Sequence, residues 1–304
     1  GDGLADDSAA IQRALDGAGT VTIPPGTYMI GSTLRVRSKT AVRADAGATI
    51  RLADGAGSDS GVFLITNEDP AGGNVEISLE GGIWDGNCAA NPRGDDGDMD
   101  GYTGTAINFV NVAELEVRDL TVRNPEAFSI RLGEVEDFRI EDIRFDHPIT
   151  RPNQDGVHVG GHSHRGVICD LRALTPRTTN DDMVALNADD DVERVLNLGM
   201  KRGPITDIEV DRLYGEDVYT FLRLLSVDAL IEDITARDVR GGCRCLAVNM
   251  GNWRFPLGVG NIRGVELSDF AVRKVRDADS EAALRHPLVA INLAVEDLRM
   301  VNFR

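Results

Sequence analysis

A short strand-like pattern recurs along this chain and constrains its fold more than any other feature. The pattern is apolar, any, apolar, any, Asp, apolar, and Asp119 and Asp142 mark two copies that stand 23 residues apart. Copies or near copies occupy residues 115–122, 138–145, 166–173, 208–215, 230–237, 265–272 and 294–300. A second apolar element lies between them, at 106–109, 129–132, 157–159, 184–186, 221–225 and 245–248. Two short strands in each repeat of about two dozen residues indicate a solenoid.

The solenoid is expected to be all-β. Apolar residues alternate with period two, as in strands, and helical periodicity is almost absent between residues 20 and 304. The lack of crossover helices excludes a doubly wound sheet, and the repeat is too long for the hairpins of an antiparallel sandwich. We therefore predict a right-handed parallel β-helix, whose coils stack about 4.8 Å apart.

The chain is expected to form one domain over residues 1–304, with a short capping helix within residues 1–20. The segment DDSAAIQRALDGAG offers Asp7 or Ser8 as the helix N-cap and places Ile11 and Leu15 on one face. Such a helix would cover the open end of the solenoid. Residues 20–31 would then form the first coil.

Two similar acidic stretches, NQDGVHV at 153–159 and NDDMVAL at 180–186, each precede an alternating strand. Aligning Asp155 with Asp182 superimposes them at an offset of 27 residues, with their valines pointing inward. His158 then points outward. The alignment predicts that Asp155, Asp181 and Asp182 lie together on adjacent coils.

The same alternation predicts more members of this outer face. It turns Arg131 outward on the preceding coil and Arg223 outward on the following one, and Asn108 joins them. Clustered carboxylates repel one another, so such a group is unfavourable unless it has a use or a cation. Acid–base cleavage of a glycosidic bond is one use, and an inverting pair would lie about 6.5–9.5 Å apart.

Five segments, taken in order, resemble glycoside hydrolase family 28, the polygalacturonase-like branch of the pectin-degrading β-helix enzymes. They are residues 1–15, GGIWDGN at 81–87, RNPEAFSIRL at 123–132, NQD at 153–155 and NDD at 180–182. The resemblance implies that Asp181 is the general acid. It also implies that Asp155 and Asp182 hold and deprotonate a water, with inversion at the anomeric carbon and no organic cofactor.

The chain departs from that family in two places. Residues 193–207 lack the family's Gly-His-Gly motif, and its Arg-Ile-Lys motif appears at best as Arg223-Leu224-Leu225. The missing Lys disfavours galacturonan as the substrate. Histidines instead lie upstream of the paired Asp, among them His158 and His162. We expect the substrate-binding residues to be Asn108, Arg131, Asn153, His158, His162 and Arg223.

Some features leave alternatives open. The acidic run at 95–101 resembles half of a calcium loop, so a structural Ca²⁺ is an option, although a solvated loop is favoured. The run at 188–193 would line the cleft or bind a cation, and Tyr219, Phe221 and Trp253 would stack on sugars or pack in the core. The four cysteines are expected to be thiols, with one disulfide as the alternative.

Charge and composition narrow the partners. The net charge of −18 argues against nucleic acid and against an anionic membrane surface. We expect a secreted or otherwise exported protein, monomeric or trimeric, that acts on an oligo- or polysaccharide; an intracellular location is the alternative. The rival functions are a polysaccharide lyase, a sugar-transferring enzyme and a non-catalytic carbohydrate-binding β-helix.

Overall fold

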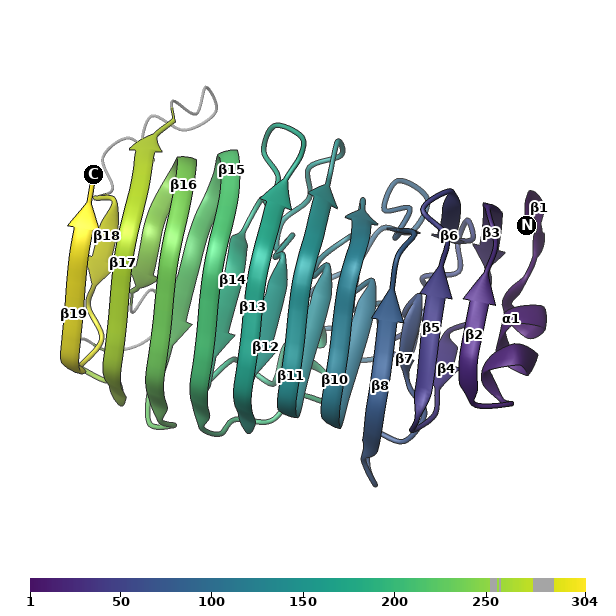
Figure 1. Cartoon of the computed structure of the whole chain (residues 1–304), viewed down its shortest axis with the longest axis horizontal. Helices are drawn as coiled ribbons and strands as arrows, with labels where there is room; N and C mark the ends of the chain where they lie inside the picture. The colour runs from purple at the N-terminus through teal and green to yellow at the C-terminus, as the bar shows by residue number, and fades with distance from the viewer. Residues whose placement is uncertain (252–255, 257, 276–286) are drawn as a thin grey trace.

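The computed structural model describes residues 1–251, 256, 258–275 and 287–304. Its strands form successive coils of a right-handed parallel β-helix, with the chain termini at opposite ends (Figure 1). Every strand pair among the described residues is parallel. The predicted fold class is therefore confirmed.

The first half of the chain contains β1 (Asp2–Asp6), α1 (Ser8–Leu15), β2 (Gly19–Ile23), β3 (Gly26–Ile30), β4 (Leu34–Val36), β5 (Thr40–Ala44), β6 (Ala48–Leu52), β7 (Ile65–Asn67), β8 (Asn74–Glu80), β9 (Ile83–Asp85), β10 (Ile107–Arg123) and β11 (Ile130–Asp146). The second half contains β12 (Val157–Gly160), β13 (Ser163–Ala173), β14 (Asp182–Asn187), the 3₁₀ helix η1 (Val195–Asn197), β15 (Ile205–Leu225), β16 (Ile231–Met250), β17 (Ile262–Lys274), β18 (Val289–Ile291) and β19 (Val295–Phe303).

The N-terminal end is capped as the sequence predicts. Helix α1 begins after Asp7 and buries Ile11 and Leu15 against the first coils. One element was not anticipated: β1 precedes the helix and pairs with β3, Asp2 opposite Thr27. Coiling therefore begins before residue 20. In the part of the chain that the structure describes, no helix is both long enough and apolar enough to traverse a membrane.

The recurrent Asp residues form the corners of the coils. Asp119, Asp142 and Asp170 each have a left-handed backbone, with φ between 51° and 57°. The strand registers place them on neighbouring coils of one corner column. From β10 onward this column is Asp119, Asp142, Asp170, Arg212, Asp238, Asp269 and Asn302, and a second column is Glu114, Asp137, Arg165, Asp207, Asp233, Gly264 and Asp297. Asp and Asn tolerate this conformation better than other side-chain-bearing residues, which explains their recurrence.

We expect the corner conformation to dominate substitutions at Asp142. In Asp142→Val, the β-branched side chain is strained at positive φ and should lower the free energy of unfolding by about 1–3 kcal/mol. The control Asp142→Asn should cost little, because the ion pair that it removes, between Asp142 and Arg144 at 3.0 Å, is largely exposed. Urea unfolding of the two variants would measure the difference, and equal stabilities would contradict the backbone explanation.

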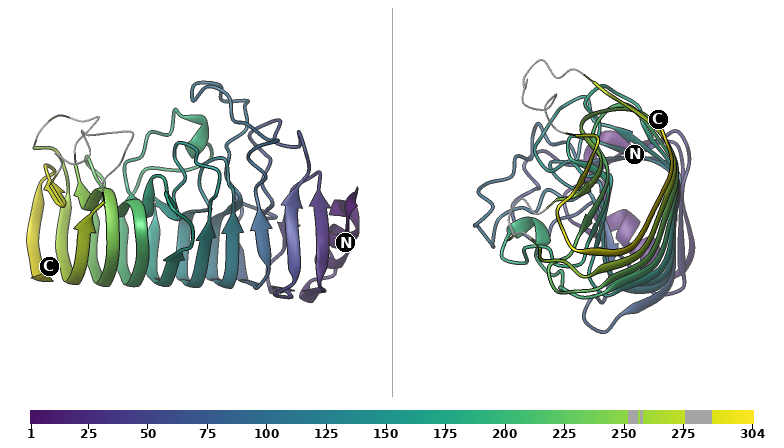
Figure 2. Two further views of the ribbon diagram at one scale, coloured as in Figure 1. Left: turned by 90° about the horizontal axis from the view of Figure 1, so that it is seen from above. Right: turned by 90° about the vertical axis from the view of Figure 1, so that its left-hand side faces the viewer.

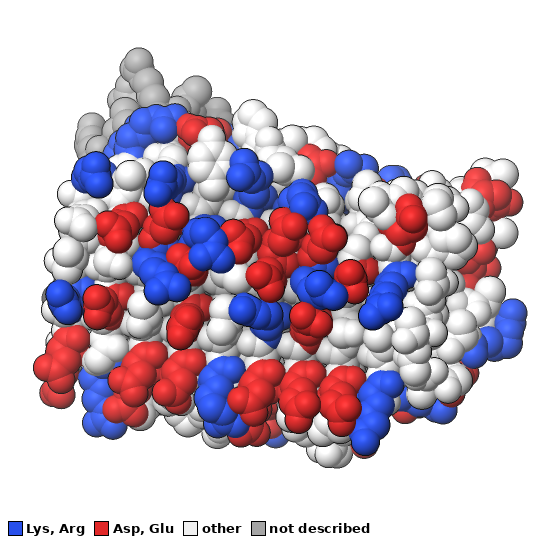
Figure 3. All heavy atoms as spheres, in the orientation of Figure 1, with Lys and Arg blue, Asp and Glu red and all other residues white. Residues whose placement is uncertain are grey.

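Charged side chains stand in rows across the outer face of the long strands (Figure 3). Arg118 on β10 lies 3.1 Å from Glu80 of β8, and Arg144 on β11 lies 3.3 Å from Asp119 of β10. Exposed pairs of this kind contribute little individually. Their importance is that these pairs set opposite charges against each other between coils, which offsets part of the repulsion between the aspartates of neighbouring coils.

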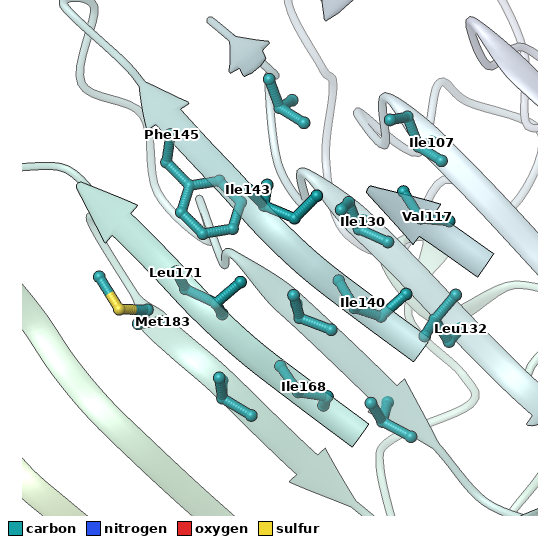
Figure 4. Close-up of a cluster of buried hydrophobic side chains, with 14 of the residues drawn as sticks. Ile107, Val117, Ile130, Leu132, Ile140, Ile143, Phe145, Ile168, Leu171 and Met183 are labelled. Atoms are coloured by element: carbon teal, nitrogen blue, oxygen red, sulfur yellow. The ribbon is translucent and has the colours of Figure 1, made fainter. Parts of the chain in front are cut away.

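Apolar side chains fill the interior between the walls of the coil (Figure 4). Phe145, Ile143 and Leu171 pack there with Met183, and all four are at most 1% exposed. Gly156 lies against this group: a Cβ at that position would come within 2.4 Å of the Met183 carbonyl oxygen and 2.9 Å of the Phe145 ring. The close approach permitted by Gly156 fixes the backbone next to Asp155.

The four cysteines are buried free thiols, as expected. Burial raises the pKa of Cys88, Cys169 and Cys243 to about 11 in each case. Since the thiolate is the reactive form, these thiols are poor nucleophiles.

Candidate active site

The two acidic turns are neighbours in the coil. Val157 pairs with Val184 and Val159 with Leu186, which is the predicted offset of 27 residues. The Gly156 amide also donates to the carbonyl oxygen of Asp182, at 2.9 Å. The alignment that places Asp155 beside Asp182 is therefore the one that the structure adopts.

This register brings three carboxyl groups together. Asp155, Asp181 and Asp182 each have an oxygen within 4.8 Å of the others'. The distances between these closest oxygens are shorter than the separation of about 6.5–9.5 Å that is expected between the two carboxyl groups of an inverting enzyme. Asn153, which the sequence also placed here, donates to Asp181 at 3.3 Å. Arg223 lies 3.9 Å from Asp182 on the next rung.

Burial sets the protonation of the paired aspartates. Burial, and next the charge of Asp155, raise the pKa of Asp181 to about 7. Burial and then the charge of Asp181 raise the pKa of Asp182 well above its usual value. Two such carboxyl groups do not both ionise readily near neutral pH, so the pair retains a proton there.

His158 links the third carboxylate to a second layer of charge. Its Nδ1 lies 2.7 Å from Asp155, its Nε2 lies 2.9 Å from Asp190, and its ring stacks on Phe128 with 4.0 Å between centroids. Burial by itself lowers the pKa of His158, but the two carboxylates outweigh it and raise the pKa to about 9. Burial likewise disfavours the charge on Asp190, yet the adjacent His158 holds the Asp190 pKa well below its usual range. His158 is therefore an imidazolium at neutral pH.

These groups line one pocket of about 570 Å³. This volume lies in the range of about 300–1,000 Å³ that is typical of ligand sites. Its lining is rich in acids, arginines and amides: Asp155, Asp181, Asp182, Asp190, Asp191, Arg177, Arg194, Arg223, Arg244, Asn153, Asn180, Asn187 and Asn249, with Phe128, Pro152, His158, Tyr219, Leu225 and Cys245. Polar groups converge here on buried acids, which is a frequent property of catalytic sites.

The sequence model of glycosyl hydrolases family 28 matches residues 17–203, which is more than half of the chain and includes both acidic turns. The chain belongs to glycoside hydrolase family 28. Among curated proteins, none is significantly similar to it in sequence.

Solved structures resemble this family 28 protein at the level of the fold. A family 28 exopolygalacturonase from Yersinia enterocolitica is 16% identical with a TM-score of 0.64, over 99% of this chain and 63% of that one. This chain thus spans less than two thirds of that enzyme. An endo-xylogalacturonan hydrolase from Aspergillus tubingensis is 15% identical with a TM-score of 0.59, over 100% and 94% of the two chains. The Streptococcus pneumoniae surface adhesin PfbA is 16% identical with a TM-score of 0.58, over 100% and 79%.

Three of the predicted substrate-binding residues lie outside the pocket of this family 28 protein. Asn108 is 3% exposed and donates to Thr66, and Arg131 is 2% exposed and donates to the Leu196 carbonyl oxygen at 2.5 Å. Both point outward, as predicted, but the loop after β14 covers Arg131. His162 is an exposed residue at a positive-φ turn and does not line the pocket. Asn153, His158 and Arg223 do line it.

Arg244 is a pocket residue of the family 28 fold that alternation does not reveal. It donates to Asn180 at 2.8 Å, lies 3.1 Å from Asp217 and stands over the Tyr219 ring. The pairing shifts here: Val218 is opposite Cys243, whereas Thr220 is opposite Leu246. An extra residue on β16 forms a bulge, and bulges redirect side chains next to active sites. To place Arg244 in the pocket from the sequence, one would have had to foresee the shift of register on β16 between Cys243 and Leu246.

The remaining candidates have separate outcomes. Asp190 and Asp191 line the pocket, as the acidic run at 188–193 suggested. Tyr219 lines it as well, whereas Phe221 is fully buried in the core, and Trp253 lies outside the described residues. In the 95–101 loop, Asp96 is engaged by Arg93 and Arg194.

Two groups of side chains in the described ranges have the spacing of metal ligands: Asp155 with Asp181 and Asp182, and Glu141 with Cys169 and Asp170. Neither coincides with the acidic loop at 95–101. A structural calcium ion in that loop stays a prediction.

Proposed function

We propose that this protein hydrolyses glycosidic bonds in a uronate-containing polysaccharide of the pectin type, by acid–base chemistry at the three clustered aspartates. The observation that carries the proposal is the raised pKa of Asp181, about 7, next to the ion pair of Asp155 with His158. Hydrolysis needs one carboxyl group that retains its proton and a second that acts in its charged form, which the imidazolium of His158 favours at Asp155. Family 28 membership supports the reaction class.

In this proposal Asp181 is the general acid. Its protonated carboxyl group donates to the leaving glycosidic oxygen, so that the departing sugar leaves as an alcohol and not as an alkoxide. Asn153, which donates to Asp181 at 3.3 Å, orients the carboxyl group. Asp181 is only partly buried, so it is accessible to a substrate at the mouth of the pocket.

Asp155 and Asp182 hold the water that attacks the anomeric carbon. A water that donates to two carboxylate oxygens at about 2.8 Å each requires those oxygens roughly 4.5 Å apart. The oxygens of Asp155 and Asp182 lie within 4.8 Å of each other, so one water can contact both. Burial raises the pKa of Asp155, and the imidazolium of His158, 2.7 Å away, opposes that rise. Among the described residues Asp182 has no such contact, so Asp155 is the better base of the two.

We propose that the reaction inverts the anomeric centre, because a water attacks directly. Proton NMR of the first product formed would report its anomeric configuration before mutarotation. The opposite configuration to the substrate is expected. A retained configuration would instead mean that an aspartate attacks the sugar directly. Retaining enzymes have closely spaced carboxyl groups, so the short spacing seen here makes this mechanism the rival to test.

Arginines supply the affinity for an acidic sugar. Arg177, Arg194, Arg223 and Arg244 all line the pocket that holds the aspartates. Arginine matches a carboxylate with two parallel N–H groups. These residues therefore provide positive charge in place of the lysine that the sequence lacks at Arg223-Leu224-Leu225. Two of the solved structures named above are, by their names, an exopolygalacturonase and an endo-xylogalacturonan hydrolase.

The pH dependence of turnover follows from Asp181. A general acid with a pKa of about 7 is protonated below that pH and loses its proton above it. We expect kcat to fall about tenfold for each pH unit above about 7. Initial rates between pH 4 and pH 9 would measure this limb, and a rate that stays constant to pH 9 would contradict the assignment.

A product assay tests the function itself. Wild-type protein would be incubated with acidic and neutral polysaccharides while reducing ends and ultraviolet absorbance are followed together. New reducing ends without absorbance are expected. Absorbing products would indicate a lyase, and saturable binding without any product would indicate a carbohydrate-binding β-helix, a role that the fold shared with the adhesin PfbA keeps as a rival.

A further inference from the structure

The floor of the pocket continues toward the N-terminal coils as one column of paired residues. The strand registers align Thr66, Asn108, Arg131, His158, Ala185, Arg223 and Asn249. An open groove along the coil would expose this column on both sides of the aspartates. Instead, Thr66, Asn108 and Arg131 on the N-terminal side are only 2–3% exposed and Asn249 on the C-terminal side is 4% exposed, whereas the Arg223 side chain between them is 20% exposed.

The loop after β14 covers the column on the N-terminal side. Its 3₁₀ helix η1 lies over Arg131, whose guanidinium donates to the Leu196 carbonyl oxygen. Leu196 is fully buried against Ala127 and Phe128, and the Phe128 ring stacks on His158. The side-chain amide of Asn197 donates to the carbonyl oxygen of Asp191, within the same loop, at 2.8 Å. The hydrogen bond from Arg131 and the apolar contacts of Leu196 therefore hold this loop against the coil.

A second loop, residues 87–105, locks onto the first. Arg194 donates to Asp96 at 2.7 Å, and the Val195 amide donates to the Asp96 carbonyl oxygen at 2.9 Å. Arg93 contacts Asp96 as well and donates to Asn153 at 3.1 Å, next to the aspartates. Both loops project from the same side of the coil, the first drawn in green and the second in blue to teal (Figure 2). We call residues 87–105 and 188–204 together the wall.

We propose that the wall closes one end of the pocket, so that the site accepts the end of a polysaccharide chain and releases short products from that end. This inference rests on the proposed hydrolase function and adds the mode of attack. A polysaccharide that extended beyond the pocket at both ends would have to break the packing of Leu196 and the ion pair between Asp96 and Arg194. Arg194, which belongs to the wall and also lines the pocket, would contact the terminal sugar.

Product sizes at early times test the mode of attack. The wild-type protein would digest a polymer that it cleaves, while viscosity is followed and products are separated by anion-exchange chromatography. We expect one short product from the first time point and little loss of viscosity. A ladder of many sizes with a rapid fall in viscosity would overturn the wall inference and leave the hydrolase intact. No cleavage of any glycoside would overturn the proposed function and this inference with it.

Matched variants locate the effect in the wall. Asp96→Ala removes the carboxylate that Arg93 and Arg194 share, and Arg194→Ala breaks the same contact from the other loop. Both should shift the products toward longer oligosaccharides. Asp98→Ala changes an exposed residue of the same loop and should retain the wild-type product. If both wall variants are folded by circular dichroism and still release only the wild-type product, the Asp96 contact does not close the pocket and the proposal fails.

Discussion

Asp181→Asn is expected to lower kcat by about 10²–10⁴-fold, the usual effect of losing a general acid. The amide has nearly the shape of the carboxyl group but cannot give a proton to the leaving oxygen. Asp181 also holds its proton at unusually high pH, with a pKa of about 7, so the neutral amide resembles the form that is present in the resting protein. Folding and substrate affinity should therefore survive. Calorimetric titration with the polysaccharide, beside initial rates, would separate binding from turnover.

The matched control for this variant is Asp119→Asn. Asp119 is an aspartate at an outer corner, its side chain is 58% exposed, and its φ of 53° suits Asn. Its turnover should equal that of the wild-type protein. If Asp181→Asn retained near wild-type turnover, the assignment of the acid would be lost. If it also lost affinity, Asp181 would be a binding residue.

His158→Ala is expected to lower the free energy of unfolding at pH 6 by about 3–5 kcal/mol, as for a buried ion pair that loses one partner. His158 is 2% exposed and lies between Asp155, which is also buried, and Asp190, whose side chain is 14% exposed. Its loss leaves two carboxylates in a low-dielectric site without their shared cation. Asp155 should then take up a proton, so that turnover falls together with stability.

The pH dependence of stability makes this prediction specific. The pKa of His158 is raised from 6.5 in the unfolded chain to about 9 in the folded one. Its stabilising contribution is therefore complete below about pH 6.5 and disappears as the pH rises through about 9; it amounts to about 3 kcal/mol at most. Urea unfolding at several pH values should show this loss in the wild-type protein and not in His158→Ala. His162→Ala, at an exposed histidine, is the control, and an unchanged pH profile in His158→Ala would refute the ion-pair account.

Alternation along the strands was sufficient to predict the arrangement of the acidic turns. A residue that points outward at 158 must lie beside one that points outward at 131, because the coils stack in register and side chains have a period of two. This is why the cluster of Asp155, Asp181 and Asp182 follows from the sequence. The corner position of Asp142 has a different physical basis, since few residues accept positive φ.

Features that break the period could not be predicted in the same way. Arg131 points outward as expected, but whether an outward residue meets solvent depends on a loop that folds back from 65 residues further along. Arg244 reaches the pocket through a bulge, which shifts the count by one residue. Strand β1 lacks a copy of the repeat and is held by its pairing with β3. In each case a tertiary contact decides the outcome and the local pattern does not.

The two corner columns have a consequence for how such a protein can change over evolutionary time or in the laboratory. Glu114 and Asp119, and likewise Asp137 and Asp142, are five residues apart, and the spacing is the same on each later coil. This edge tolerates no insertion, because a single added residue would move the inward-facing side chains of that strand to the outer face. The opposite side carries loops of unequal length, including those at 87–105 and 188–204. Among the described residues, length variation thus lies on the side that holds the acids, and new specificities can be obtained by exchanging loops on a scaffold that keeps its coil count.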